Sequence, residues 1–304
     1  MNILVTGGKG YLGRYIVKEL LNQGHTVIDY IRDMSLPSED PKHVHVFGEL
    51  YDVPRLITTI QNHKIDRIIH TAAQSHPDVG VEVPIATAEA NVMGTMGVLE
   101  AARLTGVKRI VVYSSECAYG DTHEEIITED HPLNPRTPYG VTKATTEMMA
   151  RAYNECYGMD IIALRVCQVW GPAQVMQEYI RDAIKAAVKG EMFYLPSGSE
   201  QKFQLIYVTD AARASLAACF TEKKNELAVY NITGGYQQTF GEVIKLLQEI
   251  IPDAKFDVGP GELGYDHQSL FDISAAKNDL GYVPQVSLRD GLKMYVNWLR
   301  ENEF

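Results

Sequence analysis

The stretch TGGKGYLG, residues 6–13, follows the apolar run at 3–5 and precedes a segment with helical periodicity. Its glycines fall where a nucleotide-binding βαβ unit requires them: the first permits a tight turn, the second lets the backbone approach a pyrophosphate, and the third allows close packing of helix on strand. The N-terminus of the following helix adds free N–H groups for phosphates. The stretch therefore predicts a dinucleotide-binding turn, although the same glycines also occur in plain loops.

The first half of the chain alternates short apolar runs with longer amphipathic segments, a rhythm typical of βαβ units that build a parallel sheet. We expect strands at 2–7, 25–31, 43–48, 66–72, 108–115 and 160–166, and helices at 11–23, 52–62, 85–105 and 139–157. The fold class predicted is α/β, a Rossmann-type doubly wound parallel sheet.

After Trp170-Gly171-Pro172 the regular alternation is lost. The pattern predicts a helix at 174–189, a strand at 204–208, a helix at 209–220 and a closing helix at 287–302. We therefore expect two domains. Residues 1–166 and about 201–232 would form the NAD(P)-binding Rossmann domain, and about 167–200 and 233–304 would form a smaller C-terminal α/β domain that binds the substrate.

The composition excludes several classes of function. Of the 304 residues, 39 are acidic and 28 basic, the formal net charge is −11, and no Lys/Arg run occurs, so no nucleic-acid partner is expected. No segment reaches the roughly 18 apolar residues of a membrane helix, and the N-terminus lacks the pattern of a signal peptide, so we expect no membrane association and a cytoplasmic location.

The four cysteines, residues 117, 156, 167 and 219, are far apart and form no CxxC pair. This spacing favours reduced structural thiols over a disulfide framework or a zinc site. We therefore expect no metal ligands.

The end of the second strand selects the cofactor. An acidic residue there favours the free 2′-hydroxyl of NAD, and a basic one favours the 2′-phosphate of NADP. The expected tip is Ile31, followed by Arg32, whereas Asp29 lies within the strand and Asp33 just past it. We favour NADP through Arg32, and NAD stays open because a shifted register would bring either aspartate to the ribose.

Other predicted strands also end in small or polar residues: 48–50 after the third, 70–73 after the fourth and 114–115 after the fifth. Ligands of open α/β sheets bind outside these carboxyl ends, so we expect one cleft there. His70 lies inside an apolar strand and is interpreted as a packed, hydrogen-bonded core histidine.

The segment PRTPYGVTK places Tyr139 and Lys143 four residues apart at the start of a helix, so both project from one face. A nearby ammonium stabilises a phenolate and lowers the pKa of a tyrosine, which makes the pair a proton donor or acceptor. Ser115 can add a hydrogen bond to the same substrate oxygen. Together they predict oxidation of a carbinol or reduction of a carbonyl beside a nicotinamide.

With these residues in place, the chain resembles an extended short-chain dehydrogenase/reductase, and specifically the NAD(P)-dependent epimerase/dehydratase family, which includes UDP-glucose 4-epimerase and sugar-nucleotide dehydratases. The resemblance spans essentially the whole chain. It rests on the order and spacing of these motifs: TGGKGYLG, IIHTAAQ, NVMGT, YSSECAYG, PYGVTK, LRVCQVWGP, IYVTDAARA, YNITGG and LGYVP.

The resemblance implies a cofactor site. Its residues would be Gly7, Gly10, Tyr11 and Leu12 at the pyrophosphate, Glu49 and Leu50 at the adenine, Ala72, Ala73 and Gln74 along the cofactor, and Asn91 supporting that side of the cleft.

The resemblance also implies catalytic and substrate-binding residues. Tyr139 would be the acid/base, Lys143 would tune it and hold the nicotinamide ribose, and Ser115 would orient the substrate. The substrate contacts would be Ser75, Ser115, Glu116, Gln168 and Lys202.

The departures from the family pattern concern the substrate. Gln168 replaces the usual Asn, Phe203 aligns with a usual Arg, and the region ahead of Asp272 lacks an arginine that often clamps a nucleotide diphosphate. Lys202 and Lys189 could substitute, but a lysine is a point charge and not a bidentate clamp. A nucleotide sugar is therefore only modestly favoured.

A second departure follows Ser115. Family dehydratases carry an Asp-Glu pair there, and this chain has Glu116 and Cys117. Glu116 can act as a general acid, but the second carboxylate is a thiol, which disfavours elimination by the usual route. Cys117 is interpreted as a spacer, with a proton relay as the alternative.

The predicted function is that of an NAD(P)-dependent oxidoreductase/epimerase that transfers a hydride at a sugar carbinol or ketone, most commonly of a nucleotide-activated sugar. The alternatives are an NADPH-dependent carbonyl reductase or dehydrogenase on a non-nucleotide substrate, and a non-catalytic dinucleotide-binding regulator.

Family members pair through helices that match 85–105 and 139–157, so a homodimer is expected. The alternative is that the methionines of these helices, residues 93, 96, 148 and 149, pack inside the monomer.

Overall fold

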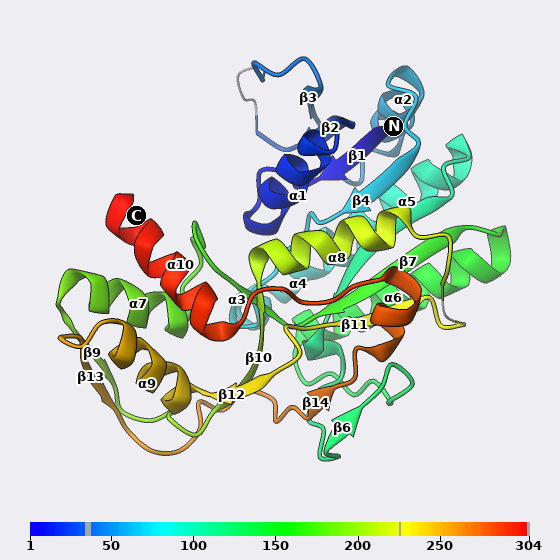
Figure 1. Ribbon diagram of the computed structural model, residues 1–304. Coiled ribbons are helices and arrows are strands. Elements are labelled where there is room, and N and C mark those ends of the chain that lie inside the picture. The colour runs from blue at the N-terminus through cyan, green and yellow to red at the C-terminus, as the bar shows by residue number, and fades with distance from the viewer. Residues whose placement is uncertain (34–37, 225, 303–304) are drawn as a thin grey trace.

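The computed structural model describes residues 1–33, 38–224 and 226–302. Its largest element is a sheet of seven strands, all parallel, in the order β11-β7-β5-β4-β1-β2-β3 (Figure 1). The bounds are β1 (Asn2–Thr6), β2 (Thr26–Ile31), β3 (His43–Phe47), β4 (Arg67–His70), β5 (Arg109–Ser115), β7 (Asp160–Val166) and β11 (Val229–Ile232). The doubly wound Rossmann-type α/β fold is confirmed, and β11 is a strand that the sequence pattern did not predict.

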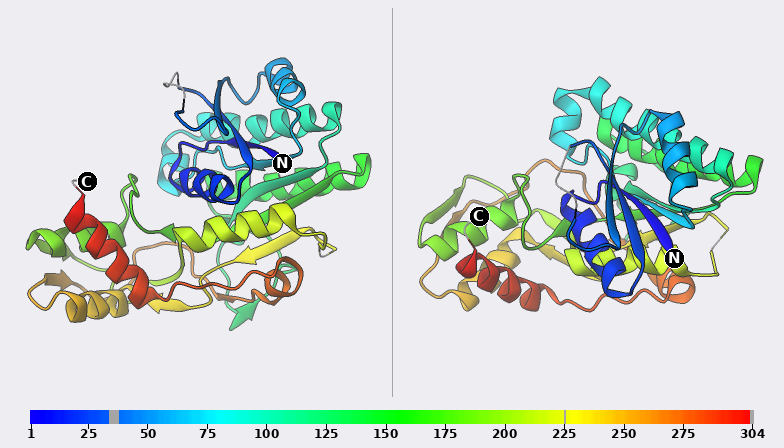
Figure 2. Two further views of the ribbon diagram at one scale, coloured as in Figure 1. Left: turned by 45° about the horizontal axis from the view of Figure 1, so that its top comes forward. Right: turned by 90° about the horizontal axis from the view of Figure 1, so that it is seen from above.

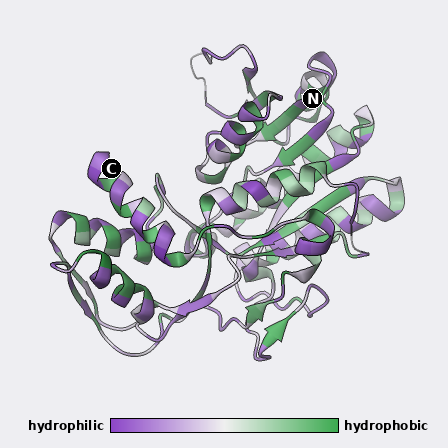
Figure 3. Cartoon of the chain, viewed as in Figure 1, coloured by the Kyte–Doolittle hydropathy of each residue, from purple (hydrophilic) through white to green (hydrophobic). Residues whose placement is uncertain are grey.

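Helices cover both faces of this sheet (Figure 2). Residues of α1 (Tyr11–Asn22) and α8 (Val208–Phe220) share one apolar core with the sheet, and residues of α2 (Val53–Asn62), α5 (Gly94–Thr105) and α6 (Pro138–Tyr157) share the other. Ile3 and Val5 enter the first core and Leu4 enters the second, because successive side chains of a strand point to opposite faces. The central strands are accordingly apolar on both faces (Figure 3).

The single helix predicted at 85–105 is wrong in its details, because the chain forms several helical pieces there. They are α3 (Pro77–Glu82), α4 (Pro84–Ala88), the π-helical turn η1 (Glu89–Met93) and α5. Pro77 and Pro84 each occupy the first helical position, where a missing N–H costs nothing. Asn91 lies in the middle of the π-helical turn, a feature common at functional sites.

A second region packs around its own core. A small sheet contains β8 (Gln168–Trp170), β10 (Lys202–Tyr207) and β12 (Gln237–Thr239), and β9 (Met192–Leu195) pairs with β13 (Lys255–Val258). The helices α7 (Tyr179–Lys189), α9 (Phe240–Ile250) and α10 (Leu288–Glu301) cover it. The short elements β6 (Ile126–Ile127), β14 (Leu270–Phe271), η2 (Glu116–Ala118) and η3 (Ala276–Leu280) complete the fold.

The strand β10 connects the two regions. Ile206 enters the core shared with α1 and α8, whereas Leu205 and Tyr207 enter the core of the second region. Its pairing partners are β8 and β12. Within 201–232, β10 thus belongs to the small sheet and β11 to the central sheet, and the domain boundaries stay a prediction.

Helix α7 begins at Tyr179, five residues later than expected from 174. Its start is set by Glu178, whose carboxylate accepts hydrogen bonds from the backbone N–H groups of Ile180 and Arg181. It ends at Gly190, which adopts the left-handed conformation with φ of 70°. In the part of the chain that the structure describes, no helix is both long and apolar enough to cross a membrane.

Candidate active site

The glycine-rich turn connects β1 to α1 and forms a compact cradle. Gly7 has φ of +75°, and a Cβ there would lie 2.9 Å from the backbone of Ala72. A Cβ on Gly13 would lie 2.1 Å from the Gly7 carbonyl oxygen, and the Gly10 N–H donates to that oxygen at 2.8 Å. The turn is therefore packed so closely that neither glycine has room for a Cβ, and this compact geometry fits the pyrophosphate-binding turn of a dinucleotide site.

Tyr11 and Leu12 form the first turn of α1, where backbone N–H groups lack partners within the helix. Their side chains are turned inward: both pack against the core of the second region, and the hydroxyl of Tyr11 is buried. Only their backbone N–H groups are available to hold a phosphate.

The end of β2 is the predicted ribose site. Ile31 is buried and Arg32, which follows it, is exposed. Asp29 is 1% exposed, and its Oδ1 accepts a hydrogen bond from the Gly8 N–H at 2.9 Å. Burial raises the pKa of Asp29, although the Gly8 N–H and His43 lower it. The carboxylate of Asp29 thus stabilises the phosphate turn through its hydrogen bond with Gly8, and it does not reach the tip of the strand.

Glu49 and Leu50 follow β3 at the same edge of the sheet. The hydroxyl of Tyr30 donates to the Glu49 carbonyl oxygen at 3.2 Å. Leu50 packs against the second apolar core, and a Cβ on Gly97 of α5 would lie 2.1 Å from the Leu50 carbonyl oxygen. The turn is therefore fixed in place, and its contact with adenine stays a prediction.

Asn91 fixes the loop that follows β4. Its Oδ1 accepts from the Gln74 N–H at 2.8 Å, and its Nδ2 donates to the Gln74 carbonyl and to Thr142 Oγ1, both at 2.9 Å. The Gln74 side chain donates to the carbonyl of His76. Asn91 therefore ties this loop to α6, and Gln74 can offer a ligand its backbone more readily than its side chain.

A cavity joins this loop to the catalytic helix. It is lined by His70, Thr71, Ala72, Ala73, Asn91, Thr95, Tyr113 and Lys143. Four residues predicted to hold the cofactor, Ala72, Ala73, Asn91 and Lys143, are thus brought together at the carboxyl ends of β4 and β5.

The predicted catalytic residues also come together. Thr137 caps α6 by accepting from the Gly140 N–H at 3.1 Å, which places Tyr139 in the first turn. Lys143 Nζ lies 5.6 Å from the centre of the Tyr139 ring and donates to the Tyr113 carbonyl at 3.0 Å. Ser115 hydrogen-bonds Tyr139 from the end of β5.

The local environment sets the charges of this group. Burial raises the pKa of Tyr139, and the hydrogen bond with Ser115 opposes that rise. Burial lowers the pKa of Lys143 to about 8. The ammonium of Lys143 therefore lies close to its titration range near neutral pH, where small changes of environment alter its charge.

Glu116 and Cys117 follow Ser115 in the turn η2. Burial, with a smaller contribution from Asp266, raises the pKa of Glu116 to about 8 against the opposing effect of a hydrogen bond from the Gln168 backbone. Burial raises the pKa of Cys117 to about 12. At neutral pH both groups keep their protons, so Glu116 can donate a proton and Cys117 is a thiol.

Gln168 does not present a free side chain. Its Nε2 donates to Glu178 Oε1 at 2.7 Å. Burial raises the pKa of Glu178 to about 7, although the N–H groups of Ile180 and Arg181 lower it. Sequence reasoning missed Glu178; its only local signal is an acidic residue directly ahead of a helix.

The other predicted substrate residues lie at different places. Ser75 Oγ lies 3.8 Å from the sulfur of Met176, so these segments meet across the cleft. Lys202 is exposed at the start of β10. Phe203 is 7% exposed and belongs to the core of the second region, so it is a packing residue. Among the residues that the structure describes, Lys202 makes no contact with Ser115, Tyr139 or Lys143.

His70 is confirmed as a core residue. It is 3% exposed, its Nδ1 lies 2.7 Å from Thr6 Oγ1, and its Nε2 lies 3.1 Å from Thr95 Oγ1. Burial lowers the pKa of His70 to about 3. A neutral imidazole with both nitrogens engaged is not available as a base.

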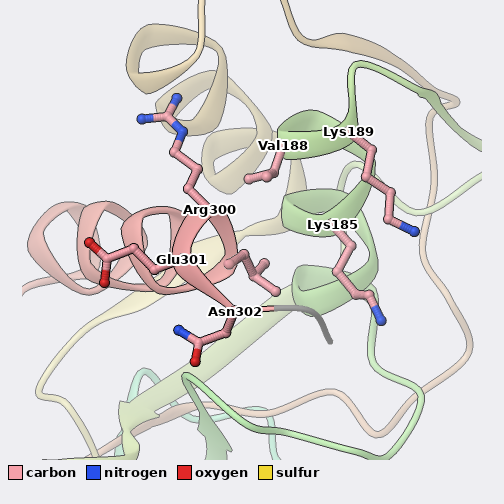
Figure 4. Close-up of a pocket in the computed structure, with 7 residues that line it drawn as sticks. Lys185, Val188, Lys189, Arg300, Glu301 and Asn302 are labelled. Atoms are coloured by element: carbon pink, nitrogen blue, oxygen red, sulfur yellow. The ribbon is translucent and has the colours of Figure 1, made fainter.

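A second hollow lies between the last turns of α7 and α10, at the end of α7 remote from Glu178 (Figure 4). Lys185, Lys189 and Arg300 line it. Lys189, a predicted substitute for the missing arginine clamp, therefore lies at the opposite end of α7 from Glu178.

Comparison with known proteins agrees with this geometry. The model of the NAD dependent epimerase/dehydratase family matches residues 3–233. A dTDP-glucose 4,6-dehydratase of Actinoplanes is 28% identical, over 99% of this chain and 98% of its own length. The UDP-glucose 4-epimerase of Thermotoga maritima, solved with UDP-glucose, has a TM-score of 0.89 at 29% identity, with 99% of each chain covered.

A further solved structure, the UDP-glucose 4-epimerase of Thermus thermophilus in complex with NAD, has a TM-score of 0.87 at 27% identity, with 99% of each chain covered. Epimerases and a dehydratase are therefore both similar to this chain over nearly its whole length. The chain belongs to the NAD-dependent epimerase/dehydratase family and is an enzyme of that family.

Proposed function

We propose that this enzyme epimerises a nucleotide-activated sugar by oxidising a carbinol to a transient ketone and reducing it again. The observation that carries the proposal is the group of Ser115, Tyr139 and Lys143, with Ser115 hydrogen-bonded to Tyr139 and Lys143 within one helical turn of it. Relatives named for UDP-glucose and dTDP-glucose support the substrate class.

The cradle over residues 7–13 fits a dinucleotide, which when bound accepts a hydride from the carbinol and returns it. Tyr139 removes the hydroxyl proton during oxidation and gives it back during reduction. Ser115 holds the same oxygen by a hydrogen bond. Lys143 supplies positive charge near Tyr139, which favours the phenolate.

The proposed cofactor is NADP, with Arg32 at the 2′-phosphate. β2 ends in an apolar residue, Arg32 is exposed beside it, and the carboxylate of Asp29 is engaged with Gly8. NAD is the alternative, since the similar structures named above include one in complex with NAD.

A second candidate is a net reductase or dehydrogenase on a substrate without a nucleotide. It is favoured by the contact between Gln168 and Glu178, which places a carboxylate at the N-terminus of α7 and occupies the amide expected to face a diphosphate. Because Glu178 accepts hydrogen bonds from Gln168 and from the backbone N–H groups that open α7, these donors are not available to a phosphate.

The test is to purify the enzyme, release its cofactor by denaturation, and assay interconversion of UDP-glucose and UDP-galactose. We expect bound oxidised cofactor and turnover without added cofactor. Tyr139→Phe should reduce kcat by about 10²- to 10⁴-fold, whereas Tyr194→Phe, at an exposed position of β9, should not.

Three results would contradict this proposal. Full activity of Tyr139→Phe would remove Tyr139 from the mechanism. Enzyme isolated without cofactor that consumes NADPH stoichiometrically with a simple ketone would favour the reductase. Cofactor binding without turnover of either substrate class would favour a non-catalytic regulator.

We also propose a homodimer, formed through α6 and the helices of residues 85–105, and a cytoplasmic location. Met93, Met96 and Met148 are 52%, 38% and 63% exposed, as an interface requires. Met149 packs against an apolar core, so for this residue the interior alternative is the right one.

A further inference from the structure

The strands β2 and β3 lie at the outer edge of the central sheet (Figure 1). There Asp29, His43 and His45 bring together three side chains of the types that ligate metals. His43 and His45 are two residues apart on β3, so both project from the same face of the strand. Asp29 is paired with His45 in the parallel register of β2 and β3. The pattern of a strand therefore places two imidazoles and one carboxylate side by side.

The donor atoms are close enough to share one ion. One ligand atom from each of the three residues lies within 4.8 Å of the others, and His43 Nε2 lies 3.7 Å from Asp29 Oδ2. A tetrahedral ion with bonds of about 2.0–2.2 Å requires donors about 3.3–3.6 Å apart. A contraction of at most about 1.5 Å would bring the three donors into that geometry.

The site also has a buried polar atom without a partner. His43 Nε2 is buried, and it has no hydrogen-bond partner among the residues that the structure describes. Its 3.7 Å distance to Asp29 is beyond hydrogen-bond range. An atom of this kind is costly to bury, and a ligand between the two groups would satisfy it.

The carboxylate is already oriented for this role. The Gly8 N–H donates to Oδ1 of Asp29 at 2.9 Å, which leaves Oδ2 directed at His43. Hydrogen bonds of this type hold ligating carboxylates in metal sites. Asp29 is buried while His43 and His45 are partly exposed, so an ion could enter from the solvent side.

We propose that Asp29, His43 and His45 form a binding site for one divalent transition-metal ion, at the edge of the sheet beside the phosphate turn. Two imidazoles and a carboxylate suit Zn²⁺ or Co²⁺ better than Mg²⁺ or Ca²⁺, which prefer oxygen ligands. The fourth position would be taken by water. The cysteine pattern indicated no metal site, and this site uses no cysteine.

The site is separate from the catalytic group. Ser115, Tyr139 and Lys143 lie at β5 and α6, and the strands β4 and β1 separate β5 from β2 in the sheet. The metal is therefore not assigned to the reaction. It would fix the β2–β3 edge and, through Asp29, the position of Gly8.

The test uses chelator-treated full-length protein titrated with Co²⁺ and Zn²⁺ alone. We expect one tight site per chain by calorimetry, visible absorption of Co²⁺ typical of a tetrahedral nitrogen and oxygen ligand set, and a higher Tm with Zn²⁺. His43→Ala and His45→Ala should each weaken binding by at least about tenfold. His63→Ala, at the end of α2, is the matched control and should bind as the parent does.

Two results would overturn the proposal. The first is a metal affinity that is the same in His43→Ala, His45→Ala and His63→Ala. The second is the lack of a Co²⁺ absorption band and of saturable binding in parent protein whose circular dichroism shows it to be folded. Either would mean that Asp29 and the two histidines form only a packed polar cluster. Asp29→Asn is left for last because it also alters the contact with Gly8.

Discussion

The side-chain amide of Gln168 donates a hydrogen bond to the carboxylate of Glu178 at 2.7 Å. The two residues belong to β8 and to the cap of α7, and their contact replaces the open amide that the family pattern predicted. Gln168 links Glu178 to Glu116, because its backbone hydrogen-bonds Glu116, and burial raises the pKa of both carboxyl groups. The predicted substrate site therefore contains two carboxyl groups of raised pKa, in a region where the sequence lacks the arginine clamp common in the family.

Glu178 should make stability depend on pH. Its pKa is about 7 in the folded enzyme against an ordinary value of 4.5, so between these values the unfolded chain releases a proton that the folded chain keeps. Folding stability from this group therefore falls as the pH rises from about 4.5 to 7 and stays low above that. The free energy of unfolding of Glu178→Gln, relative to that of the parent, should therefore rise by about 1–3 kcal/mol between pH 5 and pH 8.

Urea unfolding of both proteins at several pH values measures this difference. Glu191→Gln, at an exposed position just after α7, is the control and should follow the parent at every pH. Parallel stability profiles for Glu178→Gln and the parent would show that Glu178 is ionised normally.

Glu116 should act as a proton donor. It is half-buried directly after Ser115 and keeps its proton at neutral pH, with a pKa of about 8. Glu116→Gln should lower kcat by about 10²-fold, the lower end of the range for a general acid, with little change in cofactor affinity. Steady-state kinetics at pH 7 test this. Glu124→Gln, at an exposed position that contacts His131 and the His123 backbone, is the control. A change confined to KM would assign Glu116 to binding.

Asn91 should act by positioning the loop after β4. Asn91→Ala removes three hydrogen bonds to Gln74 and Thr142, and it should cost about 2–4 kcal/mol of stability because buried partners lose their bonds. Because the loop that contains Gln74 would then shift, the Kd of the dinucleotide should also rise by about tenfold. Thermal unfolding with and without cofactor separates the two effects, and Asn62→Ala at the end of α2 is the control. Unchanged cofactor affinity would limit Asn91 to a structural role.

Arg32 should decide between the two cofactors. If it binds the 2′-phosphate, Arg32→Ala should weaken NADP by about tenfold, since a charged hydrogen bond contributes about 1.5–3 kcal/mol, and should leave NAD unchanged. Fluorescence titration of both dinucleotides gives the ratio. Equal losses for both would place Arg32 elsewhere on the cofactor, and a parent that prefers NAD would make the NADP proposal wrong.

Met148 should lie in the dimer interface. It is 63% exposed on α6, and a charged residue there would be buried without a partner in the proposed dimer. Met148→Glu should therefore yield monomers by sedimentation or light scattering. Met294→Glu, at a 47% exposed position of α10, is the matched control and should remain dimeric. A monomeric parent would refute the interface.

Much of the site could be predicted because its signals are local. The glycines of the phosphate turn are set by one strand, one turn and one helix, and Tyr139 and Lys143 share a face because a helix repeats every 3.6 residues. The predicted strands of the central sheet match closely, because an apolar run flanked by turn residues is a short-range pattern. The sequence pattern did not predict strand β11 or the division of residues 85–105 into several helical pieces. Both depend on tertiary packing.

The sequence by itself determined the family fold, and it predicted the place of the dinucleotide and the proton-transfer group, because each depends on residues a few positions apart or on strand order in a βαβ unit. Only the tertiary structure decided which polar groups are engaged. Phe203 became a core residue, Gln168 was paired with Glu178, Asn91 was joined to Gln74, and Asp29 was brought to two histidines. These contacts join elements whose spacing along the chain carries no distance information, and buried polar atoms must find partners wherever packing places them.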